Sequence, residues 1–128
     1  MLCIGTETRE FVNERPKFWK KLIRAVREEF SGQLTYAANW DDYDQVPFWK
    51  HLDYIGVDAY FPISKDKDAT VEDLKSGWKP IVAKMDSIAQ LHDKEVILTE
   101  YGYRSIKGCA IRPWDYNCLL YTSPSPRD

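Results

Sequence analysis

Short apolar runs alternate with amphipathic segments along most of the chain. Each run is nearly continuous in apolar residues, which is typical of a strand in a parallel sheet that is buried on both faces. Four strands are predicted on this basis: Leu2–Thr6, Leu34–Asn39, Tyr54–Ala59 and Glu95–Thr99.

Segments with helical spacing lie between these strands. Asn13–Pro16 carries helix-start signals, Phe18–Phe30 continues with one apolar face, and Gly32 ends the predicted helix. The aromatic segment Val46–Leu52 predicts one or two helical turns between the second and third strands.

The connection before the fourth strand carries the longest predicted helix. Thr70–Asp73 resembles a capping box, and apolar residues recur at helical spacing from Val71 to Leu91. Pro80 lies inside this pattern, so we expect a kink or a break there. Residues 100–117 are predicted to be loop.

Helices between parallel strands imply right-handed crossovers, and two α/β architectures contain them. One is an open, doubly wound sheet, and the other is a segment of a (β/α)8 barrel. No repeat or linker divides residues 1–117, which are therefore predicted to form one unit.

The composition is that of a folded protein and narrows the choice of partners. The 128 residues include 18 basic and 20 acidic side chains, giving a formal net charge of −2, and 44% are hydrophobic. The absence of a basic run argues against nucleic acid, and no apolar stretch approaches the roughly 18 residues of a membrane span. Three scattered cysteines and two histidines fit neither a disulfide framework nor a typical zinc site.

Both ends of the sequence are expected to be cut. The first strand begins at Leu2 with no signal-peptide pattern before it, so an extracellular and a cytoplasmic location both stay open. Residues 118–128 are interpreted as a non-native tail that resembles a translated sequencing adaptor. The alternative is a natural disordered segment rich in Ser and Pro.

Polar and aromatic clusters follow all four predicted strands. In a parallel sheet the carboxyl ends of the strands meet at one edge, so these clusters are expected to converge on a single site. The clusters are Glu7, then Asn39-Trp40-Asp41, then Asp58-Ala59-Tyr60, and finally Glu100-Tyr101-Gly102-Tyr103-Arg104.

Two of these strand-end residues, Glu7 and Glu100, are carboxylates that directly follow apolar strands, and glycoside cleavage needs such a pair. One carboxylic acid protonates the leaving oxygen, and the other attacks or steers water at the anomeric carbon. Their pKa values must differ, so that one is protonated while the other is ionised. The alternative is that both only cap helices or form ion pairs.

Aromatic residues near the carboxylates suit sugar binding, because the C–H faces of a pyranose pack on rings. Trp40, Tyr60, Tyr101 and Tyr103 are the candidates. Trp19 and Trp78 lie on predicted helices and are assigned to the core, while Trp49 and Trp114 stay undecided. Dinucleotide, P-loop and nucleophile-elbow motifs are absent, and Cys3 and Cys109 are read as small apolar fillers.

Taken together, the strand-end motifs resemble those of glycoside hydrolase family 113, β-mannanase-type enzymes of a retaining (β/α)8-barrel clan. The motifs are Ile4–Glu7 (IGTE), Tyr36–Asp41 (YAANWD), Phe48–Pro62 (FWKHLDYIGVDAYFP) and Leu98–Ser105 (LTEYGYRS). The resemblance covers nearly all of residues 1–117 and implies that they are strands four to seven of a partial barrel. Where most clan members carry Asn before the acid/base, this chain carries Thr6.

The resemblance implies a role for each strand-end residue. Glu7 is the expected acid/base, Glu100 the expected nucleophile, and Tyr60 the expected hydrogen-bond donor to that nucleophile. The remaining residues expected to bind the sugar are Asn39, Trp40, Asp41, Asp58, Tyr101, Tyr103 and Arg104. The implied enzyme is a monomeric, endo-acting β-1,4-mannanase that binds mannan-type polysaccharide or oligosaccharide and needs neither metal nor organic cofactor.

Two other functions are kept as alternatives. One is a non-catalytic carbohydrate-binding barrel, and the other is a small open-sheet α/β domain for protein interaction. Half a barrel leaves two sheet edges unpaired and its apolar interior open. We therefore expect this chain alone to be poorly stable and inactive.

Overall fold

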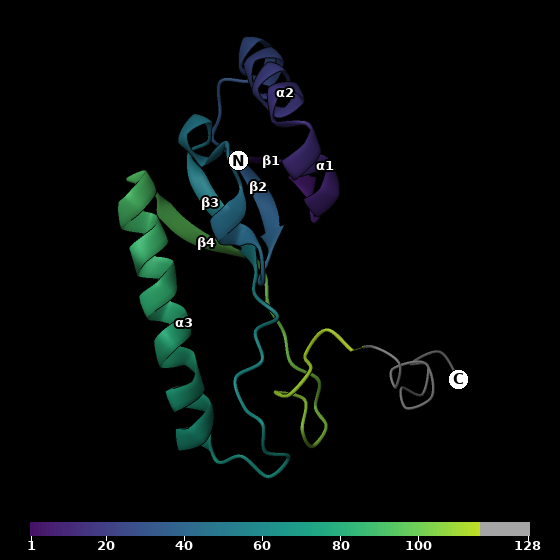
Figure 1. Cartoon of the computed structure of the whole chain (residues 1–128), viewed down its shortest axis with the longest axis vertical. Coiled ribbons are helices and arrows are strands. Elements are labelled where there is room, and N and C mark those ends of the chain that lie inside the picture. The colour runs from purple at the N-terminus through teal and green to yellow at the C-terminus, as the bar shows by residue number, and fades with distance from the viewer. Residues whose placement is uncertain (116–128) are drawn as a thin grey trace, which may run out of the picture.

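The computed structural model describes residues 1–115, so the predicted tail at 118–128 lies outside the described residues. Four parallel strands form one sheet in the order β1-β2-β3-β4 (Figure 1). A doubly wound sheet reverses its strand order at a switch point, whereas a barrel adds strands in sequence. The observed order is therefore that of a barrel segment. The strands are β1 (Leu2–Thr6), β2 (Leu34–Asn39), β3 (Tyr54–Asp58) and β4 (Glu95–Glu100).

The first connection contains two helices where one was predicted: α1 (Arg9–Glu14) and α2 (Pro16–Glu29). Arg15 separates them with an extended φ of −125°, because the residue before a proline is pushed out of the helical region. Pro16 then starts α2, where its missing N–H costs no intrahelical bond. The sequence reading missed α1 because six residues show too little of the helical period.

The aromatic segment forms two 3-10 turns, η1 (Tyr43–Gln45) and η2 (Trp49–His51), close to the prediction. Trp49, which the sequence left undecided, is fully buried, and its indole N–H donates to the Tyr43 carbonyl at 2.7 Å. Trp19 is also buried and stacks on Phe48 with 5.1 Å between ring centroids. These aromatic residues join the core that covers β2.

The last helix, α3 (Val71–His92), begins with the predicted capping box. The Asp73 backbone N–H donates to Thr70 Oγ1 at 3.2 Å, and the Thr70 N–H donates to Asp73 Oδ2 at 2.9 Å. The break expected at Pro80 does not occur, because α3 continues across it for 22 residues in all. A proline removes one helical hydrogen bond, and here Ile81 and Met85 on the following turns pack against the core.

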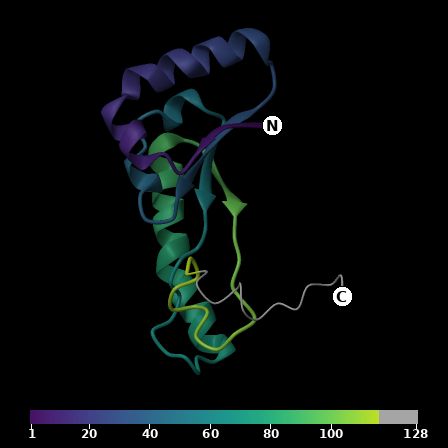
Figure 2. The same cartoon turned by 90° about the vertical axis from the view of Figure 1, so that its right-hand side faces the viewer.

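The connections after β3 and β4 extend beyond the carboxyl ends of the strands, and α3 runs back along the sheet (Figures 1 and 2). None of the helices within residues 1–115 is long and apolar enough to cross a bilayer.

Among residues 1–115, β2 and β3 are the central strands and are almost wholly buried, while β1 and β4 each pair on one side only. The two outer strands are consequently sheet edges with apolar side chains in solvent.

We predict that the 128-residue chain, expressed alone, self-associates through these edges. Leu98 on β4 is 44% exposed, and unpaired apolar edges invite pairing with another chain. Size-exclusion chromatography over a dilution series should show larger species as concentration rises. A Leu98→Lys variant should reduce that association, and Val82→Lys, at an exposed position on α3, should not. A chain that stays monomeric at every concentration would contradict this account of the edges.

Candidate active site

Parallel register brings three polar strand-end residues level with one another. Asn39 at the end of β2 lies opposite Asp58, and Asp58 lies opposite Glu100 at the end of β4. On the other side, Glu7 follows β1 directly, and its backbone N–H donates to the Ala37 carbonyl at 2.9 Å. The two glutamates are thus delivered to the same edge of the sheet from its two outer strands.

An open pocket of about 460 Å³ lies at this edge. It is lined by Glu7, Asn39, Trp40, Asp41, Tyr60, Glu100 and Trp114. Six of these seven residues were candidates from the sequence, and Trp114 was undecided. Both predicted catalytic carboxylates therefore border one cavity.

Glu7 occupies a strained and electrostatically crowded position. Its φ is +49°, in the left-handed region that non-glycine residues rarely adopt. Burial raises its pKa, and the nearby charges of Asp58, Glu100, Asp42 and Asp41 raise it further. The protonated form is favoured by this environment, which suits a group that must give up a proton to a leaving oxygen.

Glu100 has a different environment from Glu7. The Tyr60 hydroxyl donates to Glu100 Oε2 at 2.9 Å, and the Ala59 backbone N–H donates to the Glu100 carbonyl at 2.7 Å. The hydrogen bond from Tyr60 fixes the orientation of the Glu100 carboxyl group. The predicted contact between Tyr60 and Glu100 is present in the structure.

Asp58 lies beneath this pocket and does not line it. The residue is fully buried, Thr99 Oγ1 donates to its Oδ1 at 2.6 Å, and its Oδ2 has no hydrogen-bond partner among the described residues. Burial raises its pKa against the lowering effect of the Thr99 hydrogen bond, and the charge of Glu100 raises it further. Asp58 was expected to contact the sugar, and that role stays a prediction. In this structure its charge raises the pKa of Glu7.

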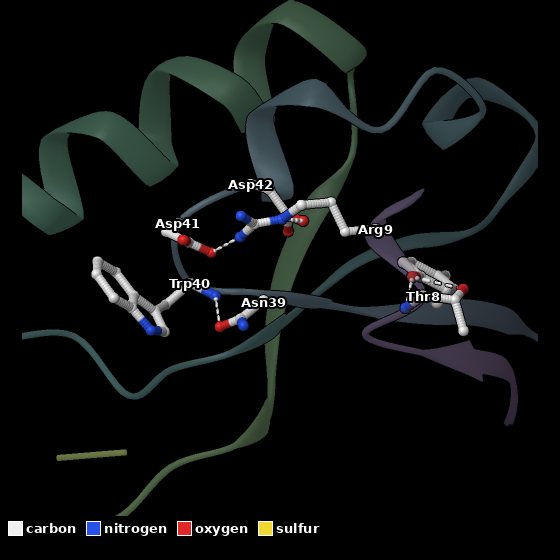
Figure 3. Close-up of polar contacts among 7 residues, drawn as sticks. Thr8, Arg9, Asn39, Trp40, Asp41 and Asp42 are labelled. Atoms are coloured by element: carbon white, nitrogen blue, oxygen red, sulfur yellow. Dashed lines mark hydrogen bonds and ion pairs between the residues drawn. The ribbon is translucent and has the colours of Figure 1, made fainter. Parts of the chain in front are cut away.

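Two features of the pocket were not predicted from the sequence. Trp114 is 41% exposed and stacks on Trp40, with 4.8 Å between centroids and 18° between planes. Arg9, two residues after Glu7, bonds to Asp41 and Asp42 at the end of β2 (Figure 3). A basic residue after one strand and an acidic pair after its neighbour was the signal that would have revealed this contact.

Three further candidates lie outside the pocket that holds the glutamates. Tyr101 is 74% exposed. The Tyr103 hydroxyl donates to the Phe61 carbonyl at 2.9 Å, and burial raises the pKa of Tyr103 to about 12. Tyr103 and Arg104 border a smaller pocket of about 190 Å³, and Tyr60 lines both this pocket and the one that holds the glutamates. No group of three or more metal-ligating side chains comes together within residues 1–115.

Comparison with known proteins now decides the family. The model of Glycoside Hydrolase Family 113 matches residues 1–125. The chain belongs to glycoside hydrolase family 113. Among curated proteins, no sequence match was found.

Solved structures of family 113 enzymes share the fold. The β-mannanase AaManA from Alicyclobacillus acidocaldarius, in complex with ManMIm, is 30% identical with a TM-score of 0.75, and the match covers 90% of this chain and 33% of that one. Two further solved structures, each described as a GH113 β-1,4-mannanase and one of them a complex, are 25% and 26% identical with TM-scores of 0.74 and 0.68. They are matched over 90% and 88% of this chain, and 33% of each of theirs.

The family assignment places the four-stranded sheet within a (β/α)8 barrel. This chain spans about a third of the length of its solved relatives. Catalytic residues of such barrels lie at the carboxyl ends of the strands, where Glu7 and Glu100 are found. To supply the rest of the barrel in experiments, residues 1–115 are grafted in place of the matching third of AaManA. This chimera is called the completed barrel below.

We predict that Asp58→Asn lowers the pKa of Glu7 in the completed barrel. Asp58 is the first of the charges that raise this pKa, and asparagine keeps the shape and the acceptor for Thr99 while removing the charge. Carboxyl ¹³C NMR titration measures the shift. Asp44→Asn is the matched control, because Asp44 pairs with Lys84 at 2.6 Å and is not among the charges acting on Glu7. A Glu7 pKa that is unchanged or higher in Asp58→Asn would contradict the claim that the charge of Asp58 raises it.

Proposed function

We propose that this chain carries both catalytic carboxylates of a retaining, endo-acting β-1,4-mannanase. The observation that supports this most is one pocket bordered by two glutamates in different environments. Burial and repulsion raise the pKa of Glu7, and the Tyr60 hydrogen bond orients the carboxyl group of Glu100. This is the division of labour between an acid and a nucleophile.

The first step forms a glycosyl-enzyme. A carboxylate oxygen of Glu100 attacks the anomeric carbon while the bond to the departing sugar breaks, and Glu7 gives its proton to the departing oxygen. In the second step, ionised Glu7 takes a proton from water as that water attacks the same carbon. Glu100 leaves as a carboxylate, and Glu7 is protonated again for the next cycle.

The rest of the pocket supplies contacts for a chain of sugars. The stacked rings of Trp40 and Trp114 offer an apolar platform, and packing on an aromatic face is how the C–H surface of a pyranose is bound. Asn39 Oδ1 accepts from the Trp40 backbone N–H at 2.8 Å, so its Nδ2 hydrogens are the donors it offers to a hydroxyl. The mannan class is proposed because the solved relatives are β-mannanases.

We predict opposite stereochemistry of azide rescue for the two glutamates in the completed barrel. Glu100→Ala should lose nearly all turnover on an activated β-mannoside, and azide should restore it by attacking the anomeric carbon directly, giving the α-mannosyl azide. Glu7→Ala should still form the glycosyl-enzyme from a substrate with a good leaving group, and azide should release the β-mannosyl azide. Without azide, Glu7→Ala should lose about 10²–10⁴-fold on mannan.

The products are identified by NMR, with Asp44→Asn again as the control that keeps both glutamates. If the completed barrel with both glutamates binds mannooligosaccharide but does not hydrolyse it, a carbohydrate-binding role replaces the hydrolase. If both alanine variants keep full turnover, other residues carry the catalysis. If the two azide products have the same configuration, the assignment of acid and nucleophile is wrong.

A further inference from the structure

The short segment that joins β1 to α1 carries Glu7 and has few anchors of its own. It consists of Glu7 and Thr8, follows an edge strand and leads into a helix of six residues. Its backbone is also strained at Glu7, where φ is +49°. A strained residue keeps its conformation only where its surroundings hold it in place, so the neighbours of this segment decide where the Glu7 carboxyl lies.

The first anchor is Tyr36 on β2. The Thr8 backbone N–H donates to the Tyr36 hydroxyl oxygen at 2.8 Å, and Thr8 Oγ1 lies 3.2 Å from the same atom. Tyr36 is itself buried, with its ring against Trp19 and Phe48 at centroid distances of 5.2 and 5.5 Å. The residue directly after Glu7 is thus tied to the rigid centre of the core.

The second anchor is Arg9, which reaches the end of β2 (Figure 3). Its Nε donates to Asp42 Oδ2 at 2.6 Å, and its Nη2 donates to Asp41 Oδ1. The planar guanidinium presents its donors to the two carboxylates in a rigid arrangement, whereas a lysine ammonium has no such fixed geometry. Asp41 borders the main pocket, so this contact joins the Glu7 segment to the rim on which sugar is proposed to lie.

The ion pairs of Arg9 with Asp41 and Asp42 also affect the pKa of Glu7. Asp41 and Asp42 are two of the four carboxylates whose charges raise the pKa of Glu7, together with Asp58 and Glu100. Arg9 provides the cation that bonds both of them. Without it, two carboxylates on the β2 side would face Glu7 with no bonded counter-charge.

We propose that Arg9 and Tyr36 are positioning residues that hold the Glu7 segment against the end of β2, so that the acid is aligned with the departing oxygen of a bound sugar. The proposal rests on the acid role given to Glu7 above. Neither side chain needs to touch substrate, because Tyr36 acts through its hydrogen bond with the Glu7 segment and Arg9 through its hydrogen bonds to the end of β2.

This role has a signature that simple stabilisation lacks. A sugar alkoxide leaves only when it is protonated, whereas dinitrophenolate leaves without help from an acid. Misplacing Glu7 therefore slows the cleavage of a mannooligosaccharide and spares the first step with a dinitrophenyl β-mannoside.

The test measures kcat/KM for both substrates in completed barrels carrying Arg9→Gln, Arg9→Lys or Tyr36→Phe. We expect Arg9→Gln and Tyr36→Phe to lose about 10–100-fold on the oligosaccharide and less than about threefold on the dinitrophenyl substrate. The kcat/KM of Arg9→Lys on the oligosaccharide should fall between those of wild type and Arg9→Gln, because an ammonium keeps the positive charge and lacks the planar arrangement of donors. Lys84→Gln, which breaks the ion pair with Asp44 elsewhere, is the matched control and should change neither value.

The pH profile supplies a second readout. Glu7 must be protonated to act as the acid, so activity on the oligosaccharide falls as pH rises through its pKa. Arg9→Gln should move this alkaline limb to higher pH, because Asp41 and Asp42 lose their bonded cation and repel the charged form of Glu7 more strongly. Tyr36→Phe removes no charge and should leave the limb in place.

A mutant cycle with Glu7→Ala separates this proposal from the proposed function. In the Glu7→Ala background, Arg9→Gln should cost nothing further on the oligosaccharide, because the acid that it positions is gone. Equal losses on both substrates, or a full Arg9→Gln loss in that background, would overturn the positioning role and leave the hydrolase assignment standing. If Glu7→Ala itself has no effect, it is the acid assignment that fails. Grafting residues 1–45 alone into AaManA retains Glu7 and both anchors and provides a second protein for the same measurements.

Discussion

Parallel pairing of four strands is the constraint on which the site depends. Because every strand runs in the same direction, residues that are far apart along the chain reach one edge of the sheet. The register sets Asn39, Asp58 and Glu100 side by side, and β1 adds Glu7 from the far side. No local motif brings the two glutamates together, so any change that shifts a strand by one residue would remove one of them from the pocket.

The same convergence concentrates negative charge. The charges of Asp41, Asp42, Asp58 and Glu100 all act on Glu7, although the whole chain carries a formal net charge of only −2. Such crowding disfavours the folded state and is typical of functional sites, where pKa values are shifted for chemistry. Tyr60 and Arg9 moderate it, one by donating to Glu100 and the other by bonding the two aspartates.

The sequence predicted the strands to within one residue because each is a compact apolar run with polar residues after it. It also predicted six of the seven residues that line the main pocket, since strand direction alone places them there. It did not predict α1, whose six residues hold too few periods, or the continuity of α3 through Pro80, which depends on packing with the sheet. The depth of Asp58 and the Trp40–Trp114 stack depend on side-chain placement in three dimensions, and no spacing in the sequence encodes them. The contact of Arg9 with Asp41 and Asp42 did have a signal, a basic residue after one strand and an acidic pair after its neighbour, which was overlooked.

The central claim is that Glu7 and Glu100 act on opposite faces of one sugar ring with a covalent intermediate between two displacements. The anomer formed first tests this claim most directly. In retaining enzymes the two carboxyl groups are about 5–5.5 Å apart, and the anomeric carbon is inverted twice. In inverting enzymes a wider spacing leaves room for water, and the carbon is inverted once. Proton NMR of mannooligosaccharide hydrolysis by the completed barrel, recorded before mutarotation, should show the β-anomer appearing first. Initial release of the α-anomer would contradict the account.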